Sequence, residues 1–171
     1  MRYRRAMKSA AIALAAAALV VPSAASARTL RLDWAETTSF GYPAMAFTVR
    51  SVTIRHDSWS VRASVTNRSG RNIGIVTEPS PYLPYRFGLL VPSLEPRRGL
   101  PETLSRDTMW RAAVSFAPKL QTDLLPGRTW RGRFSGRGTL PHRRPISVTF
   151  GVFASRELGS FSWTTAHAFT V

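Results

Sequence analysis

The strongest constraint on this fold is a strict alternation of apolar and polar residues between Trp59 and Thr66. In Trp59-Ser60-Val61-Arg62-Ala63-Ser64-Val65-Thr66 the odd positions are apolar and the even positions are polar or charged. Successive side chains of a β-strand point to opposite faces, so one face of this segment meets a core and the other meets water. The pattern therefore predicts a half-buried strand.

A second strand precedes this one and is expected to form a hairpin with it. In residues 47–54 the apolar positions change parity midway. An extra residue near Arg50-Ser51 reconciles the two halves, which predicts a β-bulge or a crossing between two sheets. His56-Asp57-Ser58 is then a short turn. Residues 67–70, Asn-Arg-Ser-Gly, have turn chemistry and end the second strand of the pair.

Further strands are expected on both sides of an irregular middle. Residues 72–76 predict one strand, and residues 85–91 and 110–116 predict two more inside a proline-rich segment at about 77–110. The loop at 96–107 is expected to be exposed, with a helical turn at its end as an alternative. After the Pro126-Gly127 turn, apolar residues alternate at Trp130, Gly132 and Phe134, at Ile146, Val148, Phe150 and Val152, and at Phe161, Trp163, Phe169 and Val171.

These patterns predict an all-β domain of seven to nine short strands. The apolar faces exceed what a single sheet could bury, so we expect two packed antiparallel sheets. We expect the last strand to reach the final residue and to be tied into a sheet. The 144 residues from 28 to 171 suit one domain with a sizeable core.

The segment from Val49 to Ile75 resembles a known pattern. It has the form of strand, turn, Trp-x-Val-x-Ala-x-Val-Thr-Asn, Ser-Gly and Ile-x-Ile, and the segment 126–136 is similar to later strands of the same kind of domain. Both resemble the immunoglobulin-like β-sandwich of many bacterial secreted proteins of unknown function. The resemblance implies a single immunoglobulin-like domain over 28–171. The inter-sheet cysteine pair and the tyrosine corner of immunoglobulins are missing, and the resemblance implies no functional residue.

The first 27 residues have the pattern of a cleavable signal peptide. Residues 1–8 hold four positive charges and no negative one, and residues 10–21 are all apolar. Ala25 and Ala27 supply the small side chains that a signal peptidase reads before Arg28. These 12 apolar residues are fewer than the ~20 that cross a membrane, so cleavage is favoured over an anchor. We expect a secreted, extracytoplasmic protein without a lipid anchor or a transmembrane segment. The ordinary secretory route is favoured, and the Arg4-Arg5 pair leaves the twin-arginine route as an alternative.

The predicted mature chain is strongly basic and contains no cysteine. It has 20 basic and nine acidic side chains, a net charge of +11, and Lys119 is its single lysine. Arginine could reflect the composition of the coding sequence, or a surface adapted to polyanions. The arginines are scattered from Arg28 to Arg156, which favours composition; a continuous arginine face would favour a polyanion. Nucleic acid fits poorly because the protein is expected to leave the cytoplasm.

The sequence offers no convincing catalytic or metal-binding set, so we expect a non-enzymatic protein without a cofactor. His56 and His142 are expected in solvated turns, and His167 on an apolar face. The histidines have no metal-ligand spacing. Asp33, Glu36 and Asp57 could converge in space as catalytic carboxylates. Thiolate chemistry is excluded by the absence of cysteine.

Aromatic residues suggest where a ligand could bind. Trp59, Trp130 and Trp163 lie on apolar faces and are expected in the core, whereas Trp34 and Trp110 could be exposed. The candidate interaction loop holds Tyr82, Tyr85, Arg97 and Arg98.

Three hypotheses follow for the function. The first is an exported interaction domain that contacts an envelope protein or an anionic surface polymer through loops or a sheet edge. The second is a proteinase inhibitor that presents the loops 77–85 and 96–107. The third is an enzyme with carboxylates that converge in space.

Overall fold

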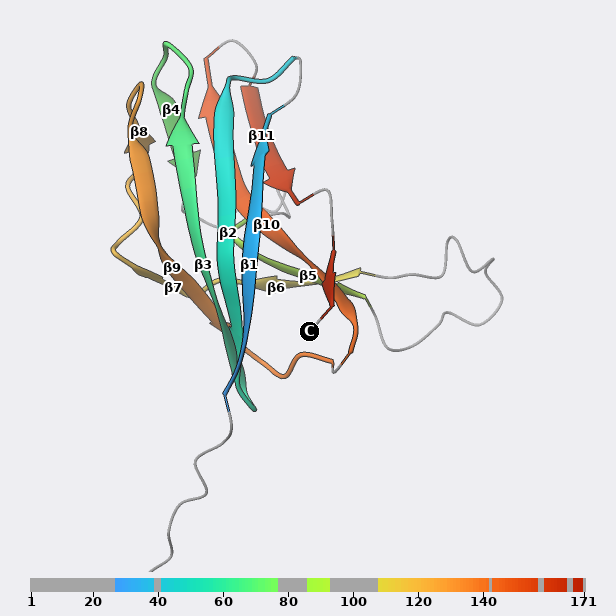
Figure 1. Cartoon of the computed structure of the whole chain (residues 1–171). Coiled ribbons are helices and arrows are strands. Elements are labelled where there is room, and N and C mark those ends of the chain that lie inside the picture. The colour runs from blue at the N-terminus through green and yellow to red at the C-terminus, as the bar shows by residue number, and fades with distance from the viewer. Residues whose placement is uncertain are drawn as a thin grey trace, which may run out of the picture.

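The computed structural model describes residues 27–38, 41–76, 86–92, 108–141, 143–156, 159–165 and 168–170. Within these ranges the chain is all-β, as predicted, with twelve strands in two antiparallel sheets and no helix (Figure 1). The number of strands exceeds the predicted seven to nine. The excess comes from the strands at Arg28–Thr37 and Asp123–Leu124, which were not predicted, and from two predicted strands that are each divided.

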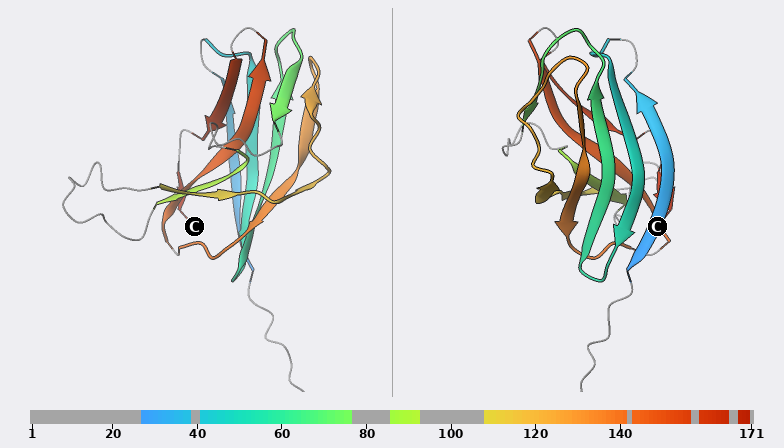
Figure 2. Two further views of the ribbon diagram at one scale, coloured as in Figure 1. Left: turned by 180° about the vertical axis from the view of Figure 1, so that it is seen from behind. Right: turned by 60° about the vertical axis from the view of Figure 1, so that its left-hand side comes forward.

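The first sheet has five strands in the order β1-β2-β3-β9-β7. They are β1 (Arg28–Thr37), β2 (Met45–Ile54), β3 (Ser58–Asn67), β9 (Thr129–Arg137) and β7 (Ser115–Ala117). Four of these strands are long and lie side by side, as the right-hand view of Figure 2 shows.

The second sheet is built around its central strand, β10 (Pro145–Ser155). One side of β10 pairs with β5 (Gly88–Pro92) and β4 (Ile73–Val76), which carry β6 (Thr108–Ala112) and β8 (Asp123–Leu124) as outer neighbours. Its other side pairs with β11 (Gly159–Thr164) and β12 (Phe169–Thr170).

The predicted hairpin and bulge are confirmed. β2 and β3 pair from Met45↔Asn67 to Ile54↔Trp59, and their register shifts between Val49 and Ser51. The pairing of β1 with β2 shifts at the same level, between Arg31 and Trp34. Extra residues in β2 and β1 therefore lie at one level of the sheet, whereas β3 pairs with β9 without a shift. The bulge places Val49 and Val52, on either side of it, in the core.

The predicted strand at 110–116 is wrong as a single element. It forms β6 in the second sheet and β7 in the first. Between them, the Ala113 N–H donates to the Phe87 carbonyl and the Val114 N–H donates to the Ser135 carbonyl, both at 2.8 Å. The backbone stays extended, but its hydrogen-bond partners change from one sheet to the other.

The predicted last strand is also divided. β11 ends at Thr164, where Thr165 exchanges two hydrogen bonds with Val148: its N–H donates to the Val148 carbonyl at 2.9 Å, and its hydroxyl accepts the Val148 N–H at 3.1 Å. Among the described residues, strand pairing with β10 resumes at Phe169, which lies opposite Ile146. The final residue, Val171, lies outside the described residues.

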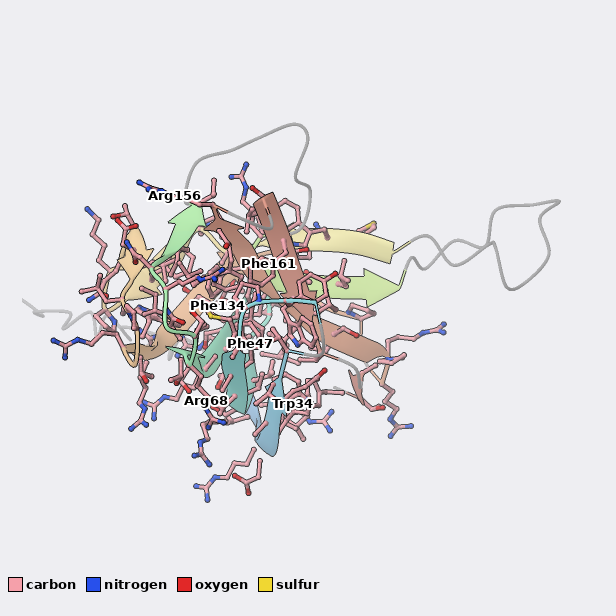
Figure 3. The ribbon with its side chains drawn as sticks, turned by 90° about the horizontal axis from the view of Figure 1, so that it is seen from above. Trp34, Phe47, Arg68, Phe134, Arg156 and Phe161 are labelled. Atoms are coloured by element: carbon pink, nitrogen blue, oxygen red, sulfur yellow. The ribbon has the colours of Figure 1, made fainter. Side chains whose placement is uncertain are left out.

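The apolar core lies between the two sheets. Phe47 of β2 contacts Phe150 and Phe153 of β10, with ring centroids 4.9 and 5.7 Å apart. Figure 3 shows Phe47, Phe134 and Phe161 inside the molecule, whereas Arg68 and Arg156 extend outward. β10 is buried on both faces. Thr149 lies between Val148 and Phe150 of the predicted alternating set, so it should face solvent, but it is buried and donates its hydroxyl hydrogen to the Arg86 carbonyl. Strict alternation fails there because side chains on both faces of β10 are covered, including Val148, Thr149 and Phe150.

The predicted turn after β3 is confirmed and is organised by a buried side chain. The Asn67 amide nitrogen donates to the carbonyls of Arg71 and Leu124, at 2.6 and 2.7 Å. Its oxygen accepts the Ser69 N–H at 2.9 Å and the Ser69 hydroxyl at 2.6 Å. Asn67 thus holds the turn and the edge strand β8 to the end of β3.

Candidate functional site

The outer face of the five-stranded sheet carries a set of exposed arginines. Alternation explains their orientation: Val61 and Ala63 of β3 are buried, and Arg62 between them is exposed. We call this surface the arginine face, and it is defined by Arg31 of β1, Arg50 of β2, Arg55 just after β2, Arg62 of β3, and Arg131, Arg133 and Arg137 of β9.

Strand register brings four of these arginines to one level of the sheet. Arg62 lies directly opposite Arg133 on β9. On its other side Arg62 pairs with Ser51, next to the bulged Arg50, and Ser51 pairs with Arg31 of β1. Neighbouring strands lie about 4.8 Å apart, so the four backbone positions span roughly 15 Å across the sheet.

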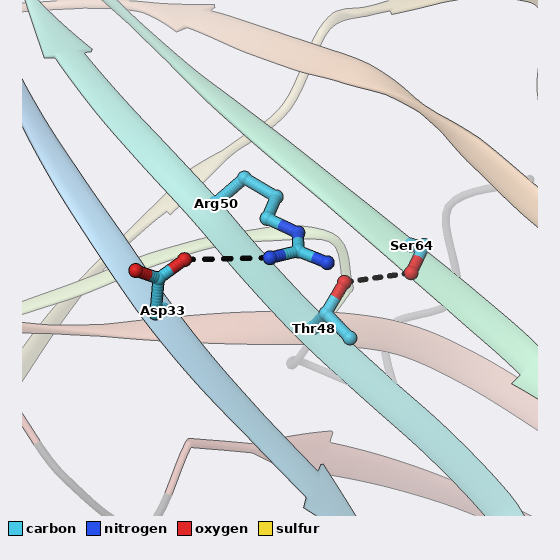
Figure 4. Close-up of polar contacts among 4 residues, drawn as sticks. All are labelled: Asp33, Thr48, Arg50 and Ser64. Carbon is cyan, nitrogen blue, oxygen red and sulfur yellow. Dashed lines mark hydrogen bonds and ion pairs between the residues drawn. The ribbon is translucent and has the colours of Figure 1, made fainter.

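A single carboxylate lies among the described residues that line this face. Asp33 accepts an ion-pair hydrogen bond from Arg50 at 3.3 Å (Figure 4). The two side chains are 96% and 68% exposed, so water and salt screen the pair and it adds little stability. The face therefore keeps a large excess of positive charge.

Hydroxyl groups fill the space between the arginines, and they pair across strands. Figure 4 shows one such pair, Thr48 and Ser64, with their oxygens 2.6 Å apart. The others are Thr66 with Thr129 at 2.9 Å, Ser115 with Ser135 at 2.7 Å, and Thr29 with Thr53 at 3.0 Å. In a pair of hydroxyls one hydrogen is shared between the oxygens and the other can be donated elsewhere.

The arginine face is hollowed by three adjoining shallow depressions. Arg133 lines all three of them, and Arg50 and Arg62 each line two. Shared residues make the depressions one continuous surface that crosses β1, β2, β3 and β9. Such a surface offers arginine forks and hydroxyl donors to an extended anionic ligand.

No protein-family model, curated protein or solved structure matches this chain. The described residues also include no helix that is long and apolar enough to cross a membrane.

The interaction loop predicted from the sequence lies outside the described residues. This applies to Tyr82, Tyr85, Arg97 and Arg98, and to most of the irregular segment that contains them. The inhibitor hypothesis, which rests on the loops 77–85 and 96–107, stays a prediction. Ala25 also lies outside the described residues, while Ala27 is exposed and Arg28 begins β1.

The three carboxylates proposed for an enzyme do not come together. Glu36 pairs with Phe47 at one end of β2, whereas Asp57 lies in the turn beyond Ile54 at the other end. At ~3.3 Å per residue this separation exceeds about 20 Å. Asp33 lies between them and is paired with Arg50. The described residues contain no group of three side chains suited to hold a metal ion.

The histidine predictions are only partly open to a test. His56 is exposed in the turn between β2 and β3, as predicted. His142 and His167 lie outside the described residues.

The tryptophans follow the predicted division only in part. Trp59 and Trp130 are buried, as predicted, and Trp163 is half-buried. Trp34, which could have been exposed, is half-buried because its ring stacks on that of Phe150, with centroids 6.3 Å apart. Trp110 is also half-buried, with its indole nitrogen enclosed. The residues next to these two rings in the sequence are only weakly apolar, but the Trp34 ring packs against Phe150, which is distant along the chain.

The arginine face was not predicted as a unit. Alternation predicts an outward position for Arg62, but the members of the face are spread over more than 100 residues of sequence. The missing information was the pairing of β3 with β9, which places Arg62 beside Arg133. The available signal was the shared alternation of arginine with apolar residues in both segments.

Proposed function

We propose that this protein is an exported, non-enzymatic binding protein whose arginine face binds an anionic polymer of the cell envelope. Export is supported by the charged start, the apolar stretch at 10–21 and the small residues Ala25 and Ala27. We further propose that the two sheets form an immunoglobulin-like sandwich, which is supported by the hairpin of β2 and β3 and its Asn-Arg-Ser-Gly turn.

The observation that carries the proposal is the placement of Arg62 directly opposite Arg133. Like charges in this position destabilise a pair of antiparallel strands. Arg50 and Arg31 add to the same level of the sheet, and Asp33, the carboxylate among the described residues that line the face, is already paired with Arg50. An anion that lies between these side chains removes the repulsion. The electrostatic free energy that destabilises the free protein therefore favours binding of the anion.

The shape of the surface favours a polymer as the ligand. The depressions are shallow, continuous and shared by four strands. A small ligand needs a concave site that covers most of its surface, whereas an extended chain can make successive contacts along an open face. The net charge of the predicted mature chain also attracts polyanions over about 10 Å at moderate salt.

Retention on heparin-agarose, as a model polyanion, tests the proposal. We expect the purified protein to be retained and to elute at a defined salt concentration, because the attraction is screened by ions. The variant R62Q/R133Q should elute at clearly lower salt. The matched control R144Q/R156Q also loses two charges, at exposed positions beside β10 and away from the arginine face.

The comparison between the two double variants decides the outcome. If both variants lose retention equally, only the total charge matters and the face is not a site. If the unmodified protein is not retained even at low salt, the proposed function is wrong.

A further inference from the structure

One of the three depressions of the arginine face combines hydroxyl groups and arginines in a described lining without a carboxylate; of the other two, one contains Asp33 and one contains no hydroxyl. The first lies where β3, β9 and β7 are adjacent, and the side chains that concern us are Arg55, Arg133, Arg137, Ser60, Ser115 and Ser135. We call it the serine–arginine pocket. Its described lining contains no carboxylate.

Strand register aligns the three serines of this pocket. Ser60 of β3 lies opposite Ser135 of β9, and Ser135 lies opposite Ser115 of β7. The oxygens of Ser115 and Ser135 are 2.7 Å apart. Since one hydrogen serves that contact, the second hydrogen of the pair can point to a ligand.

The arginines approach the same row from two directions. Arg133 is two residues from Ser135 on β9, so both project from the same face of the sheet. Arg137 lies two residues beyond Ser135 on the other side and pairs with Ser58. The carboxylate nearest in sequence, Asp57, lies in the adjoining turn, where the Ser58 hydroxyl donates to it at 3.3 Å.

The two common classes of anionic group use such donors differently. A carboxylate has two oxygens in one plane, and a single arginine fork satisfies both. A phosphate or sulfate group has additional oxygens out of that plane, and these can accept hydrogen bonds from serine hydroxyls. A pocket that combines arginines with a row of hydroxyls therefore distinguishes tetrahedral oxyanions from carboxylates.

We propose that the serine–arginine pocket binds a phosphate or sulfate group of the polymer, so that the protein selects phosphate- or sulfate-bearing chains over polycarboxylates. This inference rests on the proposed function, because it specifies the ligand of the same face. Phosphate and sulfate share the geometry that the pocket recognises, and separate arms of the experiment distinguish them.

The test compares the affinities of the purified protein for polyphosphate, dextran sulfate and poly-L-glutamate of similar length at one ionic strength, measured by isothermal titration calorimetry. We expect at least one of the first two polymers to bind about tenfold or more tightly than polyglutamate. In S115A/S135A this ratio should fall toward one. The control T48V/S64A removes a hydroxyl pair from the same face but outside the pocket, and it should keep the ratio.

Each outcome separates the inference from the proposed function. Binding of all three polymers without preference, or a preference that survives in S115A/S135A, overturns the inference and leaves polyanion binding intact. Failure to bind any polymer overturns both. NMR on the unmodified protein gives a measurement that needs no variant: inorganic phosphate should shift the amide signals of Ser115 and Ser135 before that of Ser64, and equal shifts would contradict the inference.

Discussion

Replacing Gly151 with alanine should destabilise the protein because the new methyl group meets a ring that cannot move away. Gly151 lies in β10, and a β-carbon there would be 2.5 and 2.6 Å from Cε2 and Cδ2 of Phe87. The Phe87 ring is held by five others, those of Phe116, Trp130, Phe134, Phe150 and Phe153. Any displacement of Phe87 therefore disturbs β7, β9 and β10 together.

The expected magnitude is the difference of two opposing terms. Alanine in the interior of a strand is favoured over glycine by about 0.5–1 kcal/mol. Adding a methyl group to a packed core costs about 1–3 kcal/mol. The free energy of unfolding of Gly151→Ala should therefore fall by roughly 1–2 kcal/mol, which lowers the Tm by about 3–6 °C in a domain of this size.

Phe87→Leu supplies the background that tests the cause. Leucine lacks the ring atoms that Gly151→Ala would meet, so in this background the same substitution should be neutral or stabilising by up to ~1 kcal/mol. Urea unfolding of the four proteins of this cycle, followed by tryptophan fluorescence, measures the coupling. Gly74→Ala is the control, because its β-carbon would lie 3.6 Å from that of Ala154, an ordinary contact. Equal effects of Gly151→Ala in both backgrounds would refute the reasoning.

Three further predictions concern polar contacts. Asn67→Ala leaves the carbonyls of Arg71 and Leu124 without their donor and should lower the free energy of unfolding, measured in urea, by about 2–4 kcal/mol. Asn72 is exposed, so Asn72→Ala should lower it by less than ~0.5 kcal/mol. Arg62→Gln and Arg133→Gln should each raise the unfolding free energy by a few tenths of a kcal/mol, because each removes one of two like charges that lie opposite each other. A double-mutant cycle at low salt should yield a repulsive coupling that disappears in about 1 M salt. An attractive coupling would contradict the like-charge argument. Thr165→Val removes the hydroxyl that accepts the buried Val148 N–H and should lower the Tm by about 2–6 °C. Thr165→Ser keeps a hydroxyl and should lower the Tm less. Equal Tm values for the two variants would show that the hydroxyl is not the cause.

The parts of the fold that the sequence predicted depend on neighbouring residues. The hairpin of β2 and β3 was predicted because its strands are consecutive and only one residue, near Arg50, departs from alternation. The turn at Asn67 was predicted for the same reason, since its side chain bonds to the backbone two residues later at Ser69.

The parts that it missed depend on pairing between distant segments. Residues 110–116 read as one strand because alternation carries no information about which sheet supplies the partners. Thr149 lies between the apolar Val148 and Phe150, so alternation places it on a solvated face. It is buried all the same, because both faces of β10 are covered. The arginine face required the register of Arg62 against Arg133, which neither segment encodes alone.

The two sheets are joined differently along their two edges, because the backbone at Ala113 and Val114 links them by hydrogen bonds on one side of the molecule. On this side the two adjacent amides are bonded to different sheets, at Phe87 and Ser135. On the opposite side, the ring of Trp34 of β1 meets the rings of Phe150 and Phe169 of the second sheet. Local opening should therefore begin at β1, whose amides will exchange with solvent deuterium earlier than the bonded amides of residues 113 and 114, and those of the buried central strand β10 will exchange last.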